Sequence, residues 1–177
     1  MRLVILSGGP STGKTAVINE LAKRDYPVLY EGARKIANSD KRFYGKSIKE
    51  INMRYFQEAI FESQKKEIEI LNKKNIDFVF SDRGFGDTLA YFNVYRIKIP
   101  EKFIEYAKNF NSSLVFILEN LKFYKKDSLR QESRGEMKEI HNKIIEMYKE
   151  LGYKIIFVPL LSISERVEFI LKRIQNL

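Results

Sequence analysis

Residues 8–15 read Gly-Gly-Pro-Ser-Thr-Gly-Lys-Thr and match the phosphate-binding pattern G-x-x-x-x-G-K-[ST] at every fixed position. A loop that wraps a phosphate must aim several backbone N–H groups inward, and glycine adopts the turns that this requires at little cost. In this pattern the lysine contacts the β- and γ-phosphates of a nucleotide, and the last hydroxyl binds Mg²⁺. The candidate nucleotide-binding residues are therefore Gly8, Gly9, Pro10, Ser11, Thr12, Gly13, Lys14 and Thr15.

The sequence on either side of this loop supports the same interpretation. Residues 3–6 are all apolar and predict a strand that is buried on both faces, as in a parallel sheet. Residues 14–24 carry apolar side chains at helical spacing, so the loop opens a helix whose N-terminus favours an anion. The alternative is an ordinary glycine-rich turn between a strand and a helix.

Strands and helices alternate along the rest of the chain. We expect further strands over 26–30, 76–80, 113–118 and 154–158, and further helices over 31–38, 48–71, 87–95, 101–110, 136–151 and from the capping pattern at 162–165. This alternation predicts an α/β fold with three αβα layers and about five parallel strands. The sequence contains no repeat or linker, so we expect a single domain over 1–177.

Composition excludes several classes of protein. Of the 177 residues, 44% are hydrophobic and 31% are charged, which excludes a disordered polyelectrolyte. The chain has no cysteine, so disulfides, cysteine–zinc sites and a catalytic thiol are excluded, and a cytoplasmic location is favoured. No apolar run reaches about 18 residues, so we expect no membrane span.

The positive charge is concentrated in one stretch. The formal net charge is +9, from 32 basic and 23 acidic residues. Residues 33–54 include seven basic and two acidic residues, and the aromatic residues Phe43 and Tyr44 lie among them. Such a stretch can bind a nucleotide or the 5′ end of a nucleic acid through phosphate contacts and base stacking, or it can be a solvated surface loop.

Asp82 and Arg83 lie at the expected end of the third strand. Ligands of open α/β sheets bind outside the carboxyl ends of the strands, where the Asp82 carboxylate can hold Mg²⁺. The next residue is Arg83 and not a water-activating glutamate, which favours a phosphotransferase whose arginine contacts the moving phosphoryl group. A structural Asp–Arg ion pair is the alternative.

Glu31 and Arg34 follow the second expected strand. If that strand lies beside the strand that precedes the P-loop, Glu31 can accept the proton of an attacking hydroxyl. Arg34, three residues on, can bind the acceptor or pair with Glu31. The alternative for Glu31 is an acidic residue that the helix dipole favours at a helix N-terminus. We assign the acceptor to a helical segment over about 31–75.

A second basic segment, over about 120–136, is a candidate lid. Arg130 and Arg134 are the residues in it that we expect to contact the phosphates during transfer, which a closed lid would shield from water. A charged surface segment is the alternative. His141 is the only histidine, and we expect it to have a packing or surface role.

The chain resembles the P-loop kinase-like family typified by the ribosylnicotinamide-kinase domain of the NAD-biosynthesis regulator, which is also described as an AAA-like ATPase domain. The resemblance rests on residues 8–15, 27–34 (PVLYEGAR), 81–87 (SDRGFGD) with Tyr91, 130–132 (RQE), His141, Tyr148, Gly152 and Tyr153. It implies a five-stranded parallel sheet, ATP or GTP as donor, Mg²⁺, and catalytic roles near Glu31, Asp82 and Arg83. It also adds Asp87 to the substrate-binding residues.

The sequence thus predicts a Mg²⁺- and NTP-dependent kinase. It would transfer the γ-phosphoryl group to a nucleoside, nucleotide or polynucleotide 5′-hydroxyl, and the excess charge at 33–54 favours a phosphorylated or polymeric acceptor. The rival hypothesis is a nucleotide-binding regulatory module without kinase chemistry.

Overall fold

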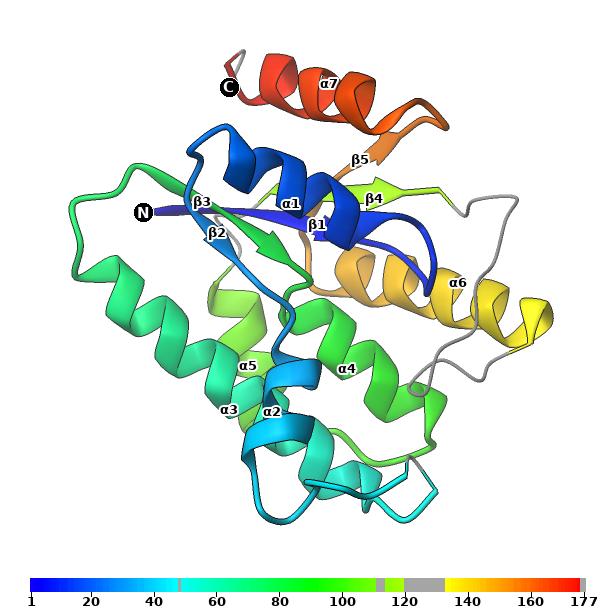
Figure 1. Cartoon of the computed structure of the whole chain (residues 1–177). Coiled ribbons are helices and arrows are strands. Elements are labelled where there is room, and N and C mark those ends of the chain that lie inside the picture. The colour runs from blue at the N-terminus through cyan, green and yellow to red at the C-terminus, as the bar shows by residue number, and fades with distance from the viewer. Residues whose placement is uncertain (48, 111–113, 120–132, 176–177) are drawn as a thin grey trace.

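A computed structural model of the chain describes residues 1–47, 49–110, 114–119 and 133–175. Its centre is a sheet of five parallel strands in the order β2-β3-β1-β4-β5 (Figure 1). The strands are β1 (Arg2–Ser7), β2 (Val28–Leu29), β3 (Phe78–Asp82), β4 (Leu114–Leu118) and β5 (Lys154–Val158). The predicted parallel sheet is confirmed.

Helices cover both faces of the sheet, which gives the predicted three layers (Figure 1). On one face lie α1 (Lys14–Lys23) and α7 (Ile163–Gln175), which pack against each other. The helices of the other side are α2 (Gly32–Ser39), α3 (Met53–Asn72), α4 (Phe85–Val94), α5 (Glu101–Asn109) and α6 (Arg134–Glu150). In the part of the chain that the structure describes, no helix is both long enough and apolar enough to cross a membrane.

The central strand β1 explains why the two layers of helices form. Its side chains alternate between the two faces of the sheet, and all of them after Arg2 are buried. Leu3 and Ile5 join the core shared with α3 to α6, whereas Val4 and Leu6 join the core shared with α1 and α7. Each fully buried aliphatic side chain contributes about 1.5–3 kcal/mol relative to an exposed one.

Capping side chains move several helix starts from the expected positions. The long helix α3 begins at Met53 rather than residue 48, because the Asn52 side chain accepts a hydrogen bond from the Tyr55 N–H (3.3 Å). The helix α6 begins at Arg134 rather than 136, because Ser133 and Glu136 form a capping box. The strand β2 has two residues instead of five, since Pro27 has no N–H to donate and α2 begins soon after.

The strand order corrects one expectation. We expected the strand that ends at Glu31 to lie beside the P-loop strand, but β3 lies between β2 and β1. All three strands are parallel, so their carboxyl ends still meet at one edge of the sheet. Glu31 therefore lies next to the end of β3, where Asp82 and Arg83 are found, and one strand further from the P-loop.

Candidate active site

The P-loop lies between β1 and α1 and has the backbone geometry that its glycines permit. Gly8 and Gly13 have φ angles of 129° and 87°, a region that side chains with a Cβ rarely adopt. A Cβ on Gly8 would also lie 2.6 Å from the carbonyl oxygen of Leu118 in β4. The loop thus packs directly on the next strand, and Gly8 is required for both its conformation and its space.

Lys14 is buried and its ammonium group bonds back to the loop. Its Nζ donates to the carbonyl oxygens of Gly8 (2.8 Å) and Gly9 (2.7 Å) and to Oγ1 of Thr12 (3.1 Å). Burial, and then the nearby Arg83 guanidinium, lower the pKa of Lys14 from 10.5 to about 7. Phosphate oxygens at this loop would therefore stabilise a charge that the protein alone disfavours.

Thr15 and Asp82 meet beside the loop. The Thr15 hydroxyl donates to a carboxylate oxygen of Asp82 over 2.9 Å, although the two residues are 67 positions apart. Burial raises the pKa of Asp82, an effect that the charges of Lys14 and Arg83 oppose. A hydroxyl and a carboxylate are hard oxygen donors of the kind that Mg²⁺ prefers, so this pair fits that ion.

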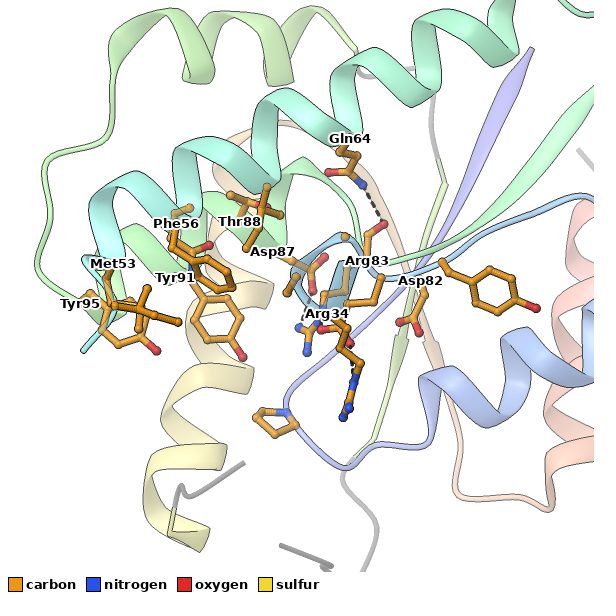
Figure 2. A pocket seen from close by; sticks show the side chains of 18 of the residues that line it. Arg34, Met53, Phe56, Gln64, Asp82, Arg83, Asp87, Thr88, Tyr91 and Tyr95 are labelled. Carbon is orange, nitrogen blue, oxygen red and sulfur yellow. Dashed lines mark hydrogen bonds and ion pairs between the residues drawn. The ribbon is translucent and has the colours of Figure 1, made fainter. Parts of the chain in front are cut away.

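Arg83 links the end of β3 to Glu31. Its Nε donates to a Glu31 carboxylate oxygen over 2.7 Å, and its guanidinium lies 5.6 Å from the Tyr91 ring centre. Its φ angle is 79°, which is strained for arginine. The carbonyl oxygen of Arg83 accepts a hydrogen bond from Gln64 over 3.1 Å (Figure 2). It also accepts one from the Ser81 hydroxyl, and the two bonds hold this conformation.

Asp87 is the buried anchor of Arg83. Its carboxylate accepts hydrogen bonds from Ser7 (2.8 Å), from the Gly84 N–H (2.9 Å) and from the hydroxyl of Tyr148 (2.6 Å), and lies 3.5 Å from an Arg83 Nη1 atom. Only 1% of Asp87 is exposed. The resemblance alone assigns Asp87 to the substrate, and in the structure its carboxylate lies both in the pocket lining and against the Arg83 guanidinium.

A pocket of about 490 Å³ opens next to these residues. At one end lie Asp82 and Arg83, and at the other Phe56, Tyr91 and Tyr95 form aromatic walls (Figure 2). The remaining lining includes Pro10 of the P-loop, Glu31, Arg34, Lys49, Gln57, Gln64, Asp87 and Thr88. The pocket therefore adjoins the phosphate loop and combines a polar end with an apolar end.

The basic stretch over 33–54 is less unbalanced than its composition indicates. Four of its seven cations form ion pairs with carboxylates, three of which lie outside the stretch. The pairs are Arg34–Glu31 (3.7 Å), Lys35–Glu67, Arg42–Asp40 (2.6 Å) and Arg54–Glu58 (3.9 Å). The charge that a polyanion would meet on this side is accordingly smaller than the sequence count.

The candidate lid falls mostly outside the described residues. Arg130 lies outside the described residues, and Arg134 is described only as the first residue of α6. Within the described residues, the structure brings Lys14, Thr15 and Asp82 together on one side, and Glu31, Arg83 and Asp87 on the other.

Two residues at the P-loop were missed or misjudged from the sequence. His141 was expected to have a packing or surface role, but its Nδ1 accepts a hydrogen bond from the Gly9 N–H over 3.0 Å. Arg166 is 2% exposed and donates from Nη1 to the Thr12 carbonyl oxygen over 2.8 Å. The available signal for Arg166 was a charged residue within the apolar face of α7, beside the buried Val167 and Ile170.

A family model described as an AAA domain matches residues 3–166, which is most of the chain. The chain belongs to this AAA-domain family. Its fold is that of the P-loop kinases, as the resemblance implied. No curated protein matches the chain significantly.

Three solved structures illustrate the fold. Deoxyadenosine kinase from M. mycoides, with products bound, matches with a TM-score of 0.67 and 13% identity, covering 100% of both chains. The NadR protein in complex with NAD and AMP-PNP matches with a TM-score of 0.65 and 20% identity over 99% of this chain. This chain spans 50% of that protein. Shikimate kinase from Aquifex aeolicus matches with a TM-score of 0.54 and 17% identity, over 99% of this chain and 97% of its own.

Proposed function

We propose that this protein is a P-loop phosphotransferase that moves the γ-phosphoryl group of ATP or GTP to a hydroxyl of a nucleoside-type acceptor. The observation that carries the proposal is the shared pocket. Its lining includes Pro10 of the phosphate loop together with Asp82, Glu31 and Arg83, so a donor on the loop and an acceptor in the pocket would meet.

The donor half uses the P-loop and the end of β3. Loop N–H groups and Lys14 would bind the phosphates, while Thr15 and Asp82, which are hydrogen-bonded to each other, would hold Mg²⁺. When bound, Mg²⁺ neutralises charge on the phosphate oxygens. We assign the segment over about 120–136, with Arg130 and Arg134, to the lid that covers the donor.

The acceptor half uses Glu31 and Arg83. The acceptor hydroxyl oxygen attacks the γ-phosphorus, the bond from that phosphorus to the β–γ bridging oxygen breaks, and the hydroxyl proton passes to the Glu31 carboxylate. The products are the phosphorylated acceptor and a nucleoside diphosphate. Arg83 stabilises charge on the moving group, and its ion pair with Glu31 (2.7 Å) keeps both side chains at the polar end of the pocket.

The pocket supports an acceptor of nucleoside size within the segment over about 31–75. Its volume of about 490 Å³ falls in the range of small-molecule sites, and its aromatic end suits a planar ring. The side-chain amide of Gln57, which is 5% exposed and lines the pocket, can hydrogen-bond to the edge of a base. The solved relatives described as kinases are consistent with this class of reaction.

The test is a measurement of nucleoside diphosphate release with a panel of acceptors. We expect release from ATP or GTP to require an added nucleoside, and to fall to background in a Lys14→Ala variant. A matched Lys23→Ala variant, at the exposed end of the same helix, should keep full activity. No acceptor-dependent release across the panel, whether because nothing is released or because release is the same without acceptor, would contradict the proposal and favour a nucleotide-binding regulatory module without kinase chemistry.

The basic stretch motivates one alternative acceptor, a polynucleotide 5′-hydroxyl. Transfer of labelled phosphate to an oligonucleotide would fall steeply with salt, because the chain's cations would displace counterions. Transfer to a neutral nucleoside would depend only weakly on salt. Efficient, salt-sensitive transfer to oligonucleotides, with none to free nucleosides, would replace the nucleoside assignment.

A further inference from the structure

Helix α6 contacts both halves of the site through two side chains on the same face. His141 and Tyr148 are seven residues apart, which is about two helical turns. His141 Nδ1 accepts from the Gly9 N–H of the P-loop, and the Tyr148 hydroxyl donates to Asp87, the carboxylate behind Arg83. One rigid element thus touches the donor loop and the acceptor-side network.

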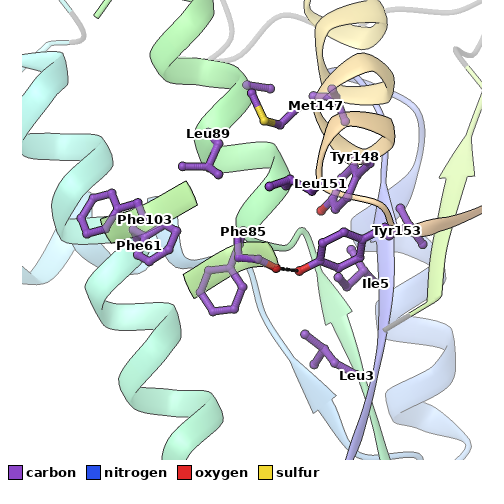
Figure 3. Packing of buried hydrophobic residues seen from close by; sticks show 14 of the residues in the cluster. Leu3, Ile5, Phe61, Phe85, Leu89, Phe103, Met147, Tyr148, Leu151 and Tyr153 are labelled. Atoms are coloured by element: carbon purple, nitrogen blue, oxygen red, sulfur yellow. Dashed lines mark hydrogen bonds between the residues drawn. The ribbon is translucent and has the colours of Figure 1, made fainter. Parts of the chain in front are cut away.

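The surroundings of Tyr148 are built around its hydroxyl. The side chain is fully buried (Figure 3). It covers two glycines, Gly84 at the N-cap of α4 and Gly86 in the first turn of that helix. A Cβ on Gly86 would lie 2.5 Å from the Tyr148 ring, and one on Gly84 would lie 2.7 Å from its hydroxyl oxygen. Any larger residue at either position would push the phenol away from Asp87.

The Tyr148 hydroxyl acts as a donor under all ordinary conditions. Burial, followed by the nearby Asp87 charge, raises the pKa of Tyr148 well above 10. The 2.6 Å bond therefore joins a neutral phenol to a carboxylate, which is a strong, charge-assisted bond. It fixes Asp87, whose other carboxylate oxygen lies 3.5 Å from the Arg83 guanidinium.

We propose that α6 holds the donor loop and the acceptor-side arginine in register, with His141 and Tyr148 as positioning residues. Tyr148 acts on Arg83 through Asp87, and His141 acts on the P-loop through the amide of Gly9. Neither residue touches the reacting atoms. The proposal rests on the phosphotransferase function proposed above, since it concerns how that site is oriented.

The experiment compares two buried tyrosines, one in the last turns of α6 and one just after that helix. Tyr148→Phe and Tyr153→Phe each remove a buried hydroxyl, but the Tyr153 hydroxyl donates to the Ala107 carbonyl oxygen (2.8 Å), away from the site (Figure 3). We expect Tyr148→Phe to lower the kcat for transfer on the order of tenfold, with nucleotide affinity unchanged. Tyr153→Phe should keep kcat within about twofold of the wild-type value, while its melting temperature falls about as much as that of Tyr148→Phe. Equal kcat values for the two variants would overturn the role of Tyr148.

A second pair of variants isolates the His141 contact. His141→Ala removes the acceptor for the Gly9 N–H, whereas the Oδ1 of an asparagine side chain falls near the position of His Nδ1 and can replace it. We expect His141→Ala to raise the KM for the nucleotide several-fold and His141→Asn to restore most of it. Two variants of equal KM would overturn the role of His141.

The same measurements separate this proposal from the proposed function. Wild-type protein without acceptor-dependent transfer would refute the phosphotransferase. In that case nucleotide affinity, measured by calorimetry, still tests His141. Weaker nucleotide binding in His141→Ala, restored in His141→Asn, supports the contact with Gly9. Unchanged nucleotide affinity in His141→Ala refutes it. Active wild-type protein with an unaffected Tyr148→Phe variant would refute only the positioning of Arg83.

Discussion

At the scale of single residues, Lys14 has the most unusual environment at the site. Its pKa of about 7 lies below the ordinary 10.5, so in the free protein its ammonium loses its proton as the pH rises above 7. Between these values the unfolded chain binds more protons at Lys14 than the folded one, so this residue makes the free protein more stable as the pH rises from 7 to 10.5.

Nucleotide binding should therefore depend on pH in the opposite direction. Phosphates favour charged Lys14, so binding above pH 7 takes up a proton, and affinity should fall as the pH rises through 7 toward 9. Calorimetry in buffers of different ionisation enthalpy measures this proton. Uptake should vanish in Lys14→Ala, and unchanged uptake in that variant would assign the proton to another group.

Glu31 gives the second prediction at this scale. Glu31→Gln keeps the size of the side chain but removes the base, so kcat should fall by roughly 10²–10⁴-fold while nucleotide affinity changes little. This change also removes the ion pair between Glu31 and Arg83. The matched control is Glu67→Gln, which removes the ion pair with Lys35 at another pocket-lining glutamate. An equal loss of nucleotide affinity would instead mean that Glu31 is structural.

At the scale of elements, α7 reaches the P-loop through one buried charge. The Nε and Nη2 atoms of Arg166 have no hydrogen-bond partner among the described residues, and burial lowers the pKa of this guanidinium. A buried charge that is only partly paired costs stability, and an apolar residue of similar size often removes that cost. Arg166 therefore costs the fold stability while it fixes the Thr12 carbonyl group.

Arg166→Met should separate these two effects. We expect a melting temperature equal to or above that of the wild type, and a nucleotide affinity several-fold weaker because the loop loses its bond to α7. Thermal unfolding and calorimetry measure the two quantities, and Arg173→Met, at an exposed position of the same helix, is the control. Strong destabilisation with unchanged affinity would show that Arg166 serves only the fold.

The elements also show what a sequence can predict. The P-loop and Asp82 were predictable because a local pattern and a strand end determine where they lie. The contacts of His141, Tyr148 and Gln64 were not, since each joins segments far apart in the chain. The place of β2 beside β3 depends on how a long connection crosses the sheet, which no local pattern encodes.

At the scale of the whole molecule, the basic charge has a different meaning than the sequence indicated. Within the stretch over 33–54, four of the seven cations form ion pairs with carboxylates of α3 or of the two residues that flank α2. The feature on this side that points to a ligand is instead the partly apolar pocket that adjoins the phosphate loop. It lies on the side of the sheet that holds α2 to α6. The central claim is that this pocket holds a small acceptor for the γ-phosphoryl group.

Mass spectrometry of the acceptor tests that claim most directly. The protein would be incubated with Mg²⁺, γ-labelled ATP or GTP, and a panel of nucleosides together with a 5′-hydroxyl oligonucleotide. The account predicts that at least one nucleoside gains a single labelled phosphoryl group, and that the Lys14→Ala and Glu31→Gln variants lose this product. Label that appears only in inorganic phosphate, or in the oligonucleotide and in no nucleoside, would contradict it.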